Sequence, residues 1–473
     1  MKSIHRKFIK LSRRLIQDNN RRQRIRNALK GYEAKRGSTI ERFQNWEAAR
    51  QVAAQIKWEA INHLDEFLPQ FVDNATKNGM KIHWADNSYQ AQSIILDIAQ
   101  KNQAKTVVKS KSMTTEEISL NSALKKKNYT VIETDLGELI VQLKNEPPYH
   151  LVFPSMHLSK EEIGEIFAMH FDVGLTHDPE TLTQIAREQL RLKFLQADIG
   201  ITGVNFAVAE TGAICITENE GNARLVATCP RIHIAVMGIE KIIPRMQDLA
   251  LFLPMLATSG SGQHLTAYNS LYFGPRKTHE QDGPEELHLI ILDNQRTTLL
   301  ARPHQRELLH CIRCGACLNI CPVFQNAGGH AYAAPYQGPI GSVIMPYLRG
   351  IHSWKHLAKA STLCGACTEI CPVKINLHHH LLDLREQAYR LKRNLLENSL
   401  FKLYTLYALN QSRFRPILRL FYYLQNLHKF IAGKPFDPFR RWCLRRELPR
   451  LRRHSFRSFW RRQRKNLPRL MLK

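Results

Sequence analysis

The sequence lacks any long hydrophobic run. No stretch of its 473 residues approaches the roughly 18 consecutive apolar residues that a transmembrane helix needs. The basic start, MKSIHRKFIKLSRRLIQDNN, contains a Ser-Arg-Arg run. However, Asp18, two asparagines and then four arginines follow where an export signal would need an apolar segment. We therefore expect a cytoplasmic protein with no spanning helix.

The short motifs of several common cofactors are also missing. The chain has no G-x-G-x-x-G fingerprint, no Walker lysine after a glycine-rich loop and no C-x-x-C-H. These absences argue against a dinucleotide site and a covalently attached haem. We expect no FAD, NAD or haem.

Acidic residues are scarce at both ends of the chain. Residues 1–30 contain 11 Lys or Arg and one acid, and residues 391–473 contain 22 Lys or Arg and three acids. The overall charge of +27 therefore comes from the ends, since residues 31–390 are nearly neutral. In the C-terminal segment the arginines alternate with Phe and Trp. This pattern favours docking on an anionic membrane surface or an acidic partner, and nucleic acid is the less expected partner.

Cysteine is rare outside two short segments. Three of the ten cysteines, Cys215, Cys229 and Cys443, stand alone and are expected to be small buried hydrophobic residues. The other seven lie in CIRCGACLNICPVF, residues 311–324, and STLCGACTEICPVK, residues 361–374. In a cytoplasmic chain such grouping indicates metal binding rather than a disulfide framework.

The first segment has the spacing C-x2-C-x2-C-x3-C-P, which is typical of bacterial iron–sulfur proteins. In the two-cluster arrangement, the fourth cysteine of each segment binds the other cluster. The predicted ligands of cluster one are Cys311, Cys314, Cys317 and Cys371, and those of cluster two are Cys321, Cys364 and Cys367. Two clusters, most simply 4Fe–4S, are therefore expected. A zinc site is the alternative, because zinc also uses C-x2-C pairs.

The second segment has Ser361 where the first has Cys311. Three outcomes follow for the fourth ligand position of cluster two. The Ser361 oxygen, water or another side chain binds the iron, or the position stays open to a partner or substrate, or the cluster is 3Fe–4S.

The middle of the chain alternates apolar strands with helical segments. That alternation predicts an α/β domain with a mainly parallel sheet. The segments read as strands are TVVKSKS, YTVIETD, HLVFP, GAICITE, RIHIAVMG and LHLIILD. The predicted regions are an N-terminal helical region (1–70), the α/β domain (71–300), a double-cluster domain (305–385) and a basic C-terminal region (386–473).

Candidate ligand-binding residues lie at predicted strand ends, where open α/β sheets bind their ligands. They are Asn205, Glu210 and Glu218, with SGSGQH, residues 259–264, as a candidate anion-binding loop. Glu210 is either a catalytic carboxylate or a residue that orients a loop. His330 and the run His378 to His380 are candidate proton or metal groups, and solvated histidines are the alternative.

Several long segments resemble the lactate utilization protein B family. They include KSKSMTTEEISLN, FPSMHLSKEEIGEIF, ITGVNFAVAETGAICITENEGNARL, FLPMLATSGSGQHLTAYNS and both cysteine segments, and the resemblance runs over about residues 30 to 390. It implies a lactate-utilization (LUD) domain, similar in fold to sugar-isomerase and CoA-transferase proteins, followed by an α-helical ferredoxin-like domain. The serine at position 361 also agrees with the family pattern.

The resemblance further implies a function. The chain would be the electron-carrying iron–sulfur subunit of a three-protein system that oxidises L-lactate to pyruvate. Two alternatives stay open: the chain itself oxidises lactate with its α/β domain and the open cluster position, or it is an iron–sulfur regulatory protein that uses its basic tail on nucleic acid.

Overall fold

The computed structural model describes residues 2–391, 395–437, 439–443, 446–448, 450–452 and 456–466. It divides into two compact units, Met1–Ala388 and Tyr389–Lys473, and each is described by itself. Across the described residues, no helix combines the length and the apolar character needed to cross a membrane.

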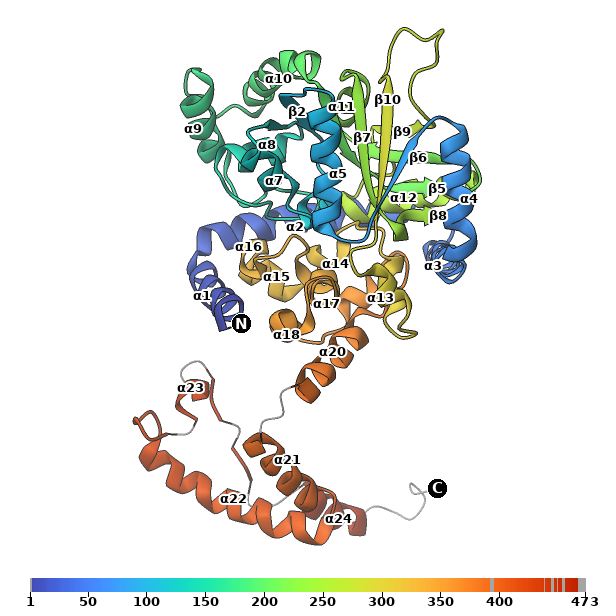
Figure 1. Cartoon of the computed structure of the whole chain (residues 1–473). Helices are drawn as coiled ribbons and strands as arrows, with labels where there is room; N and C mark the ends of the chain where they lie inside the picture. The colour runs from blue at the N-terminus through green and yellow to red at the C-terminus, as the bar shows by residue number, and fades with distance from the viewer. Residues whose placement is uncertain are drawn as a thin grey trace. The chain divides into compact units, whose positions relative to one another are not determined.

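A six-stranded parallel sheet forms the centre of the first unit, with the strand order β1-β10-β7-β4-β2-β3 (Figure 1). Every residue of β7 is buried, as expected for a strand covered on both faces. Along the chain, the strand order changes direction between β4 and β2. The strands are β1 (Lys81–Ala85), β2 (Thr106–Lys109), β3 (Thr130–Glu133), β4 (Ile199–Gly203), β7 (Ile232–Gly238) and β10 (Glu286–Leu292).

Helices cover both faces of this sheet because successive strand residues point to opposite sides. Val107 of β2 packs with α5 (Ser88–Lys101) and α7 (Leu120–Lys126). Its neighbour Val108 packs on the other face. The helices on that second face are α8 (Leu136–Leu143), α9 (Lys160–Phe171), α10 (Pro179–Gln196) and α11 (Asn222–Thr228).

A second, four-stranded sheet lies beside the first and was not predicted from the sequence. Its order is β8-β5-β6-β9, and β6, the predicted strand GAICITE, pairs antiparallel with both of its neighbours. Its strands are β5 (Phe206–Val208), β6 (Ala213–Glu218), β8 (Ile242–Ile243) and β9 (Tyr268–Tyr272).

The segment HLVFP is a loop, so its prediction as a strand is wrong. The Nδ1 atom of His150 accepts the backbone N–H groups of Val152, at 2.9 Å, and Phe153, at 3.1 Å. These bonds replace the ladder bonds of a strand and fold the segment into turns.

The N-terminal helices pack between the α/β domain and the cysteine region. Helix α1 (Lys2–Gln17) contacts α15, α16 and α18, whereas α2 (Asn19–Ile40) contacts α12 and α15 (Figure 1). Arg22 and Arg26 of α2 both donate to the Asn326 side chain, at 2.8 and 2.9 Å. The basic N-terminus is thus part of the folded unit. The other two helices are α3 (Trp46–Asn62) and α4 (Leu64–Lys77).

Short helices make up the cysteine region, and one continuous hydrophobic core joins them to the rest of the unit. This core includes Leu29 of α2, Phe252 and Leu318. The combination of an α/β domain with a helical cysteine domain confirms the predicted fold class. The helices of this region are α14 (Ala316–Asn319), α15 (Pro322–Ala327), α16 (Gly329–Tyr332), α17 (Gly338–Leu348), α18 (Ile351–Trp354), α19 (Ala366–Glu369) and α20 (Leu377–Leu391). The remaining helices of the α/β domain are α6 (Met113–Glu117), α12 (Leu249–Gly260) and α13 (Arg296–Leu300).

The second unit contains α21 (Leu395–Ala408), α22 (Gln411–Ile431), α23 (Arg440–Cys443) and α24 (Phe456–Asn466). None of the large apolar side chains of α21 is buried. Leu395, for example, is 78% exposed and Phe401 is 61% exposed. The unit therefore presents apolar side chains to its surroundings.

Candidate metal centre and adjoining cavity

The two cysteine segments fold into the same loop. Arg313 and Gly315 have φ angles of +62° and +81°, and the corresponding Leu363 and Gly365 have +56° and +84°. Each loop then enters a one-turn helix, α14 or α19, that carries the third cysteine position. The sequence repeat is therefore a structural repeat, with glycine at a position whose positive φ favours it.

Ser361 occupies the place of a cysteine in the second loop. Its Oγ accepts the backbone N–H of Leu363 at 3.0 Å, and the Sγ of Cys311 accepts the equivalent N–H of Arg313 at 3.4 Å. The two side chains therefore point the same way within matching loops. A hydroxyl oxygen lies where the first loop has a sulfur.

All seven cysteines of the two segments are free thiols, and six of them belong to or pack against one hydrophobic cluster: Cys311, Cys314, Cys317, Cys321, Cys367 and Cys371. Burial, together with the nearby Cys311, raises the pKa of Cys371 to about 12. Burial likewise raises the pKa of Cys367 to about 11, with Cys321 and Cys364 adding to the effect. In both cases the fourth cysteine of one segment interacts with a cysteine of the other segment, as the predicted ligand sets require.

These thiols suit a metal group that supplies positive charge. A buried thiol without a cation keeps its proton, whereas metal ligation removes it. The donor set of seven sulfurs and one hydroxyl would hold two iron–sulfur groups. The first group would be held by Cys311, Cys314, Cys317 and Cys371. Cys321, Cys364 and Cys367 would hold the second, with Ser361 beside it.

The two groups differ in exposure. Cys314, Cys317 and Cys371 are at most 9% exposed, whereas Cys364 is exposed. A Cβ atom added at Gly365 would meet nothing within 4 Å. Hydrogen bonds from the Ala366 backbone, and then from Thr362, lower the pKa of Cys364. Cys321 and Cys367 of the second group are also buried, at 6% and 7% exposed, and Cys311 of the first group is half-buried. The second group therefore reaches the surface of the unit only at Cys364.

Cationic side chains surround the buried group. Arg50 of α3 donates to the carbonyl oxygens of Cys371, at 3.0 Å, and Glu369, at 2.8 Å. Arg313, within the first loop, stacks over the Tyr336 ring with its guanidinium carbon 4.6 Å from the ring centroid. These charges favour the anionic form of the thiols and of any group they hold.

Arg313 also belongs to a buried charge network that the sequence analysis missed. Its Nη2 lies 3.2 Å from Glu240, and Glu240 in turn accepts from Arg296 at 2.5 Å. Arg296 donates to Glu117 at 2.8 and 2.9 Å, and the Tyr336 hydroxyl donates to Glu117 at 2.7 Å. Burial alone would raise the pKa of Glu240, but Arg296 and Arg313 lower it to about 2. The network joins the α/β domain to the cysteine region through ionised groups.

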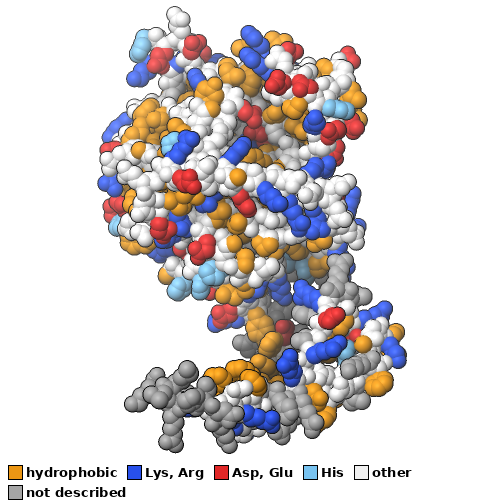
Figure 2. All heavy atoms as spheres, turned by 180° about the vertical axis from the view of Figure 1, so that it is seen from behind, with side chains coloured by type: hydrophobic (Ala, Val, Ile, Leu, Met, Phe, Trp, Pro, Cys, Tyr) orange, Lys and Arg blue, Asp and Glu red, His pale blue; other side chains and the backbone are white. Residues whose placement is uncertain are grey.

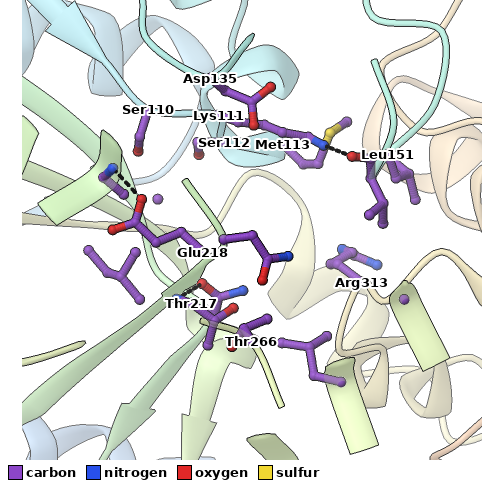
Figure 3. Close-up of a pocket in the computed structure, with 18 of the residues that line it drawn as sticks. Ser110, Lys111, Ser112, Met113, Asp135, Leu151, Thr217, Glu218, Thr266 and Arg313 are labelled. Carbon is purple, nitrogen blue, oxygen red and sulfur yellow. Dashed lines mark hydrogen bonds between the residues drawn. The ribbon is translucent and has the colours of Figure 1, made fainter. Parts of the chain in front are cut away.

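A cavity of about 340 Å³ lies where the α/β domain meets the first cysteine loop. Its walls include the loops after β2 and β4, the end of β6 and, from the cysteine region, Arg313, Cys314 and Tyr336. Figure 3 shows Glu218 and Thr217 approaching from the strands and Arg313 from the opposite side. The loops after β2 and β4 flank the point where the strand order changes direction, which is where open α/β sheets bind ligands.

Two of the three predicted ligand-binding residues line this cavity, and the third does not. Asn205 and Glu218 line it, as do Gly260 and Ser261 of the SGSGQH loop. Glu210 does not line it and instead accepts the backbone N–H of Met246 at 2.8 Å. This bond is the kind expected of a residue that orients a loop, which is one of the two roles considered for Glu210.

Three of the four candidate histidines are hydrogen-bonded within the fold, and the fourth, His379, is exposed. The Nε2–H group of His330 donates to the Pro147 carbonyl at 2.8 Å, and this ring lies with His157 and Glu146. These three offer ligand atoms within 4.8 Å of one another, although His157 already bonds Glu146 at 2.9 Å. His380 bonds Glu307 at 2.6 Å, and His378 bonds Thr368 at 2.7 Å.

Comparisons with known proteins agree with this architecture. Residues 68–292 match the LUD domain model, and residues 307–375 match the 4Fe-4S dicluster domain model. The chain is 43% identical over 387 residues to lactate utilization protein B of Shouchella clausii, covering 82% of this chain and 81% of that protein. It is 40% identical over 444 residues to the protein of the same name from Oceanobacillus iheyensis, covering 93% and 92% of the two chains. It is 44% identical over 353 residues to that of Bacillus subtilis, covering 74% of each. These matches confirm the resemblance found in the sequence, and the chain belongs to the lactate utilization protein B family.

Proposed function

We propose that the chain is an iron–sulfur electron carrier in the oxidation of L-lactate to pyruvate, within a system of several lactate-utilization proteins. The observation that carries this proposal is the pair of matching cysteine loops, the first beside a cavity and the second reaching the surface at Cys364. When bound, each cluster supplies one-electron transfer. Lactate oxidation releases two electrons and two protons, so two neighbouring one-electron sites match its demand.

The chain's own residues set the direction of this path. The surface position of Cys364 makes the second group the site where a partner protein would exchange electrons. Arg50 and Arg313 place positive charge beside the first group, which favours its reduced, more negative state.

The test is the metal content of protein purified without oxygen. About eight irons per chain, with two reduced 4Fe–4S signals in electron paramagnetic resonance, are expected. About seven irons with an oxidised 3Fe–4S signal would instead mean that Ser361 leaves one iron position empty. Bound zinc with little iron would overturn the proposal.

The cavity favours a second candidate function. Because its wall includes Cys314 of the first loop, a substrate bound there would lie next to the first group. The chain would then oxidise lactate itself. Reduction of the clusters by L-lactate in the isolated protein would favour this enzyme role, and reduction only after partner proteins are added would favour the carrier.

We further propose that the basic C-terminal unit docks the protein on the inner face of an anionic membrane. Its net charge and its exposed Leu, Phe and Trp side chains support this placement.

A further inference from the structure

The acidic and basic side chains of the cavity differ in how many of their hydrogen bonds are made within the protein. The three carboxylates already accept backbone N–H groups. Glu218 accepts from Ala223 at 2.5 Å and from Arg224 at 2.8 Å. Asp135 caps α8 and Glu220 accepts from the first residue of that helix, at 3.0 and 2.9 Å. These carboxylates are therefore held in place by the protein and do not require a cation from outside.

Cationic side chains of the same cavity have N–H donors without acceptors. Arg313 is 7% exposed in its side chain, and its Nε and Nη1 atoms have no partner among the described residues. The ammonium of Lys241, a residue 8% exposed, forms no hydrogen bond or ion pair within the described part of the chain. Buried N–H donors without acceptors are costly, and an anion would satisfy them.

The charge of the cavity limits which anion fits. Lys111, Lys241 and Arg313 contribute positive charge, and Asp135, Glu218 and Glu220 oppose it. Burial and then the charge of Asp135 raise the pKa of Glu220 to about 7, so its negative charge is partial at neutral pH. A monoanion is accommodated in such a balanced site, whereas a phosphate dianion would meet repulsion from the carboxylates. The volume of about 340 Å³ lies at the small end of the range for ligand sites.

We propose that this cavity binds a small monocarboxylate, with Lys241 and Arg313 holding the carboxylate and the side chains of Asn205 and Glu218 facing its other polar groups. Asn205 presents its amide N–H₂, since its Oδ1 already accepts the N–H of Thr217 at 3.0 Å. A 2-hydroxy or 2-oxo acid has this distribution of groups. The assignment deepens the function proposed above, because the name of the relatives points to lactate.

Occupancy of the cavity also acts on the first cysteine group. Cys314 is part of the cavity wall, so the bound anion adds negative charge next to the group that this loop holds. This charge opposes the arrival of an electron and lowers the reduction potential. By linkage, reduction weakens binding of the carboxylate by the same factor. A tenfold loss of affinity on one-electron reduction corresponds to a fall of about 59 mV. This second consequence rests on the proposed presence of clusters.

The experiment is calorimetric titration of the anaerobically purified full chain with L-lactate, pyruvate and inorganic phosphate. We expect both carboxylates to bind and phosphate to bind at least tenfold more weakly. In Lys241→Gln the dissociation constant for L-lactate rises at least tenfold. The matched control is Lys101→Gln, which removes the same charge from the exposed end of α5, outside the cavity, and leaves the affinity unchanged. Equal unfolding midpoints of the two variants show that both remain folded.

The outcomes separate this inference from the proposed function. A cluster-loaded chain that binds no carboxylate overturns the inference and leaves the carrier role standing. A chain without iron that still binds L-lactate in a Lys241-dependent way supports the site and overturns the carrier. Tighter binding of phosphate than of L-lactate overturns the monocarboxylate assignment. A potential of the buried cluster that does not fall when L-lactate is added overturns the coupling to the first loop.

Discussion

At the scale of single residues, the chemistry of the second cysteine group depends on Ser361. Its oxygen is held by the Leu363 N–H in the way that the Cys311 sulfur is held by Arg313. Ser361→Cys should therefore place a thiol at the fourth position without rearranging the loop. We expect the electron paramagnetic resonance signal of the exposed cluster to change and that of the buried cluster to stay the same, because softer sulfur ligands alter an iron site.

The control for this prediction is a pair of matched substitutions. Cys321→Ser removes a proposed ligand of the second group and should lower the iron content. Cys229→Ser makes the same change at a half-buried thiol outside both groups and should leave the iron content unchanged. A Ser361→Cys protein with spectra identical to those of the native chain would contradict a role of this side chain at the cluster.

The buried ion pairs give a second prediction at this scale. Arg296 is fully buried between Glu117 and Glu240. Arg296→Met leaves two buried carboxylates short of a partner, and it should reduce the free energy of unfolding by about 3–5 kcal/mol. The comparison is Arg231→Met, which breaks the pair with Glu285 at 3.3 Å where both side chains are about half exposed. That change should cost less than about 1 kcal/mol in denaturant unfolding. Equal losses in the two variants would contradict the structural role of the network.

The residues that sequence reasoning found and missed differ in a physical way. The cysteines were predictable because metal ligation imposes a short, fixed spacing. Arg313 occupies one of the variable positions between the cysteines, so the motif itself gives it no role. Its part in the buried charge network is visible only from its contacts with Glu240 and Tyr336. Glu117 and Arg296 are 179 positions apart, so no local pattern could pair them.

At the scale of secondary structure elements, strands with a continuous apolar run were predicted best. The central strand β7 was found because its seven residues are all buried and form one apolar run. The buried strands β4, β5 and β8 were missed, since β4 contains two glycines and β5 and β8 have only three and two residues. The strands β1 and β9 were missed because most of their residues are at least partly exposed. HLVFP has the composition of a strand, but the local bonds to His150 hold it as a loop beside the cavity. Local composition cannot reveal such a bond.

The burial of histidines in these elements makes stability depend on pH. Burial lowers the pKa of His233 in β7 to about 3, with His288 adding to the effect, whereas an unfolded chain has about 6.5. Between these values the unfolded chain binds one more proton, so the free energy of unfolding falls as the pH falls. The slope from this residue is about 1.4 kcal/mol per pH unit.

His233→Gln should therefore flatten the pH dependence of stability between about pH 5 and pH 6 by that amount. The measurement is denaturant unfolding at several pH values in that range. The same replacement at His279, which is exposed in a loop, serves as the control and should leave the slope as it is in the native chain. A His233→Gln protein with the native slope would show that the ring is already charged in the folded state.

At the scale of the whole molecule, the first unit is built around one shared core. Helix α2, the α/β domain and the cysteine region contribute to the same hydrophobic cluster, and the charge network crosses the same boundary. The family resemblance predicted the two domains, but it did not predict that the basic N-terminus would be folded between them. This arrangement ties the cavity rigidly to the first cysteine loop, since both belong to one compact unit.

The second unit carries the last prediction. Figure 2 shows hydrophobic and basic side chains together on its described surface. In α24, Phe456, Phe459 and Trp460 are 72%, 56% and 46% exposed, and basic residues occupy the positions between and after them. Aromatic side chains can enter the lipid interface while arginines bind the anionic headgroups, each adding about 1 kcal/mol.

We therefore expect the full chain to sediment with anionic vesicles and not with neutral ones, and the binding to weaken as salt screens the charges. Arg461→Gln combined with Arg462→Gln should weaken this binding, and Phe459→Ser combined with Trp460→Ser should weaken it even at low salt.

A chain ending at Ala388 should lose the binding and keep its full iron content, because all seven clustered cysteines lie before that residue. Unchanged binding by the shortened chain would contradict membrane docking through this unit, and the N-terminal helices would then have to carry it. Loss of iron on shortening would instead show that the second unit supports the metal centre.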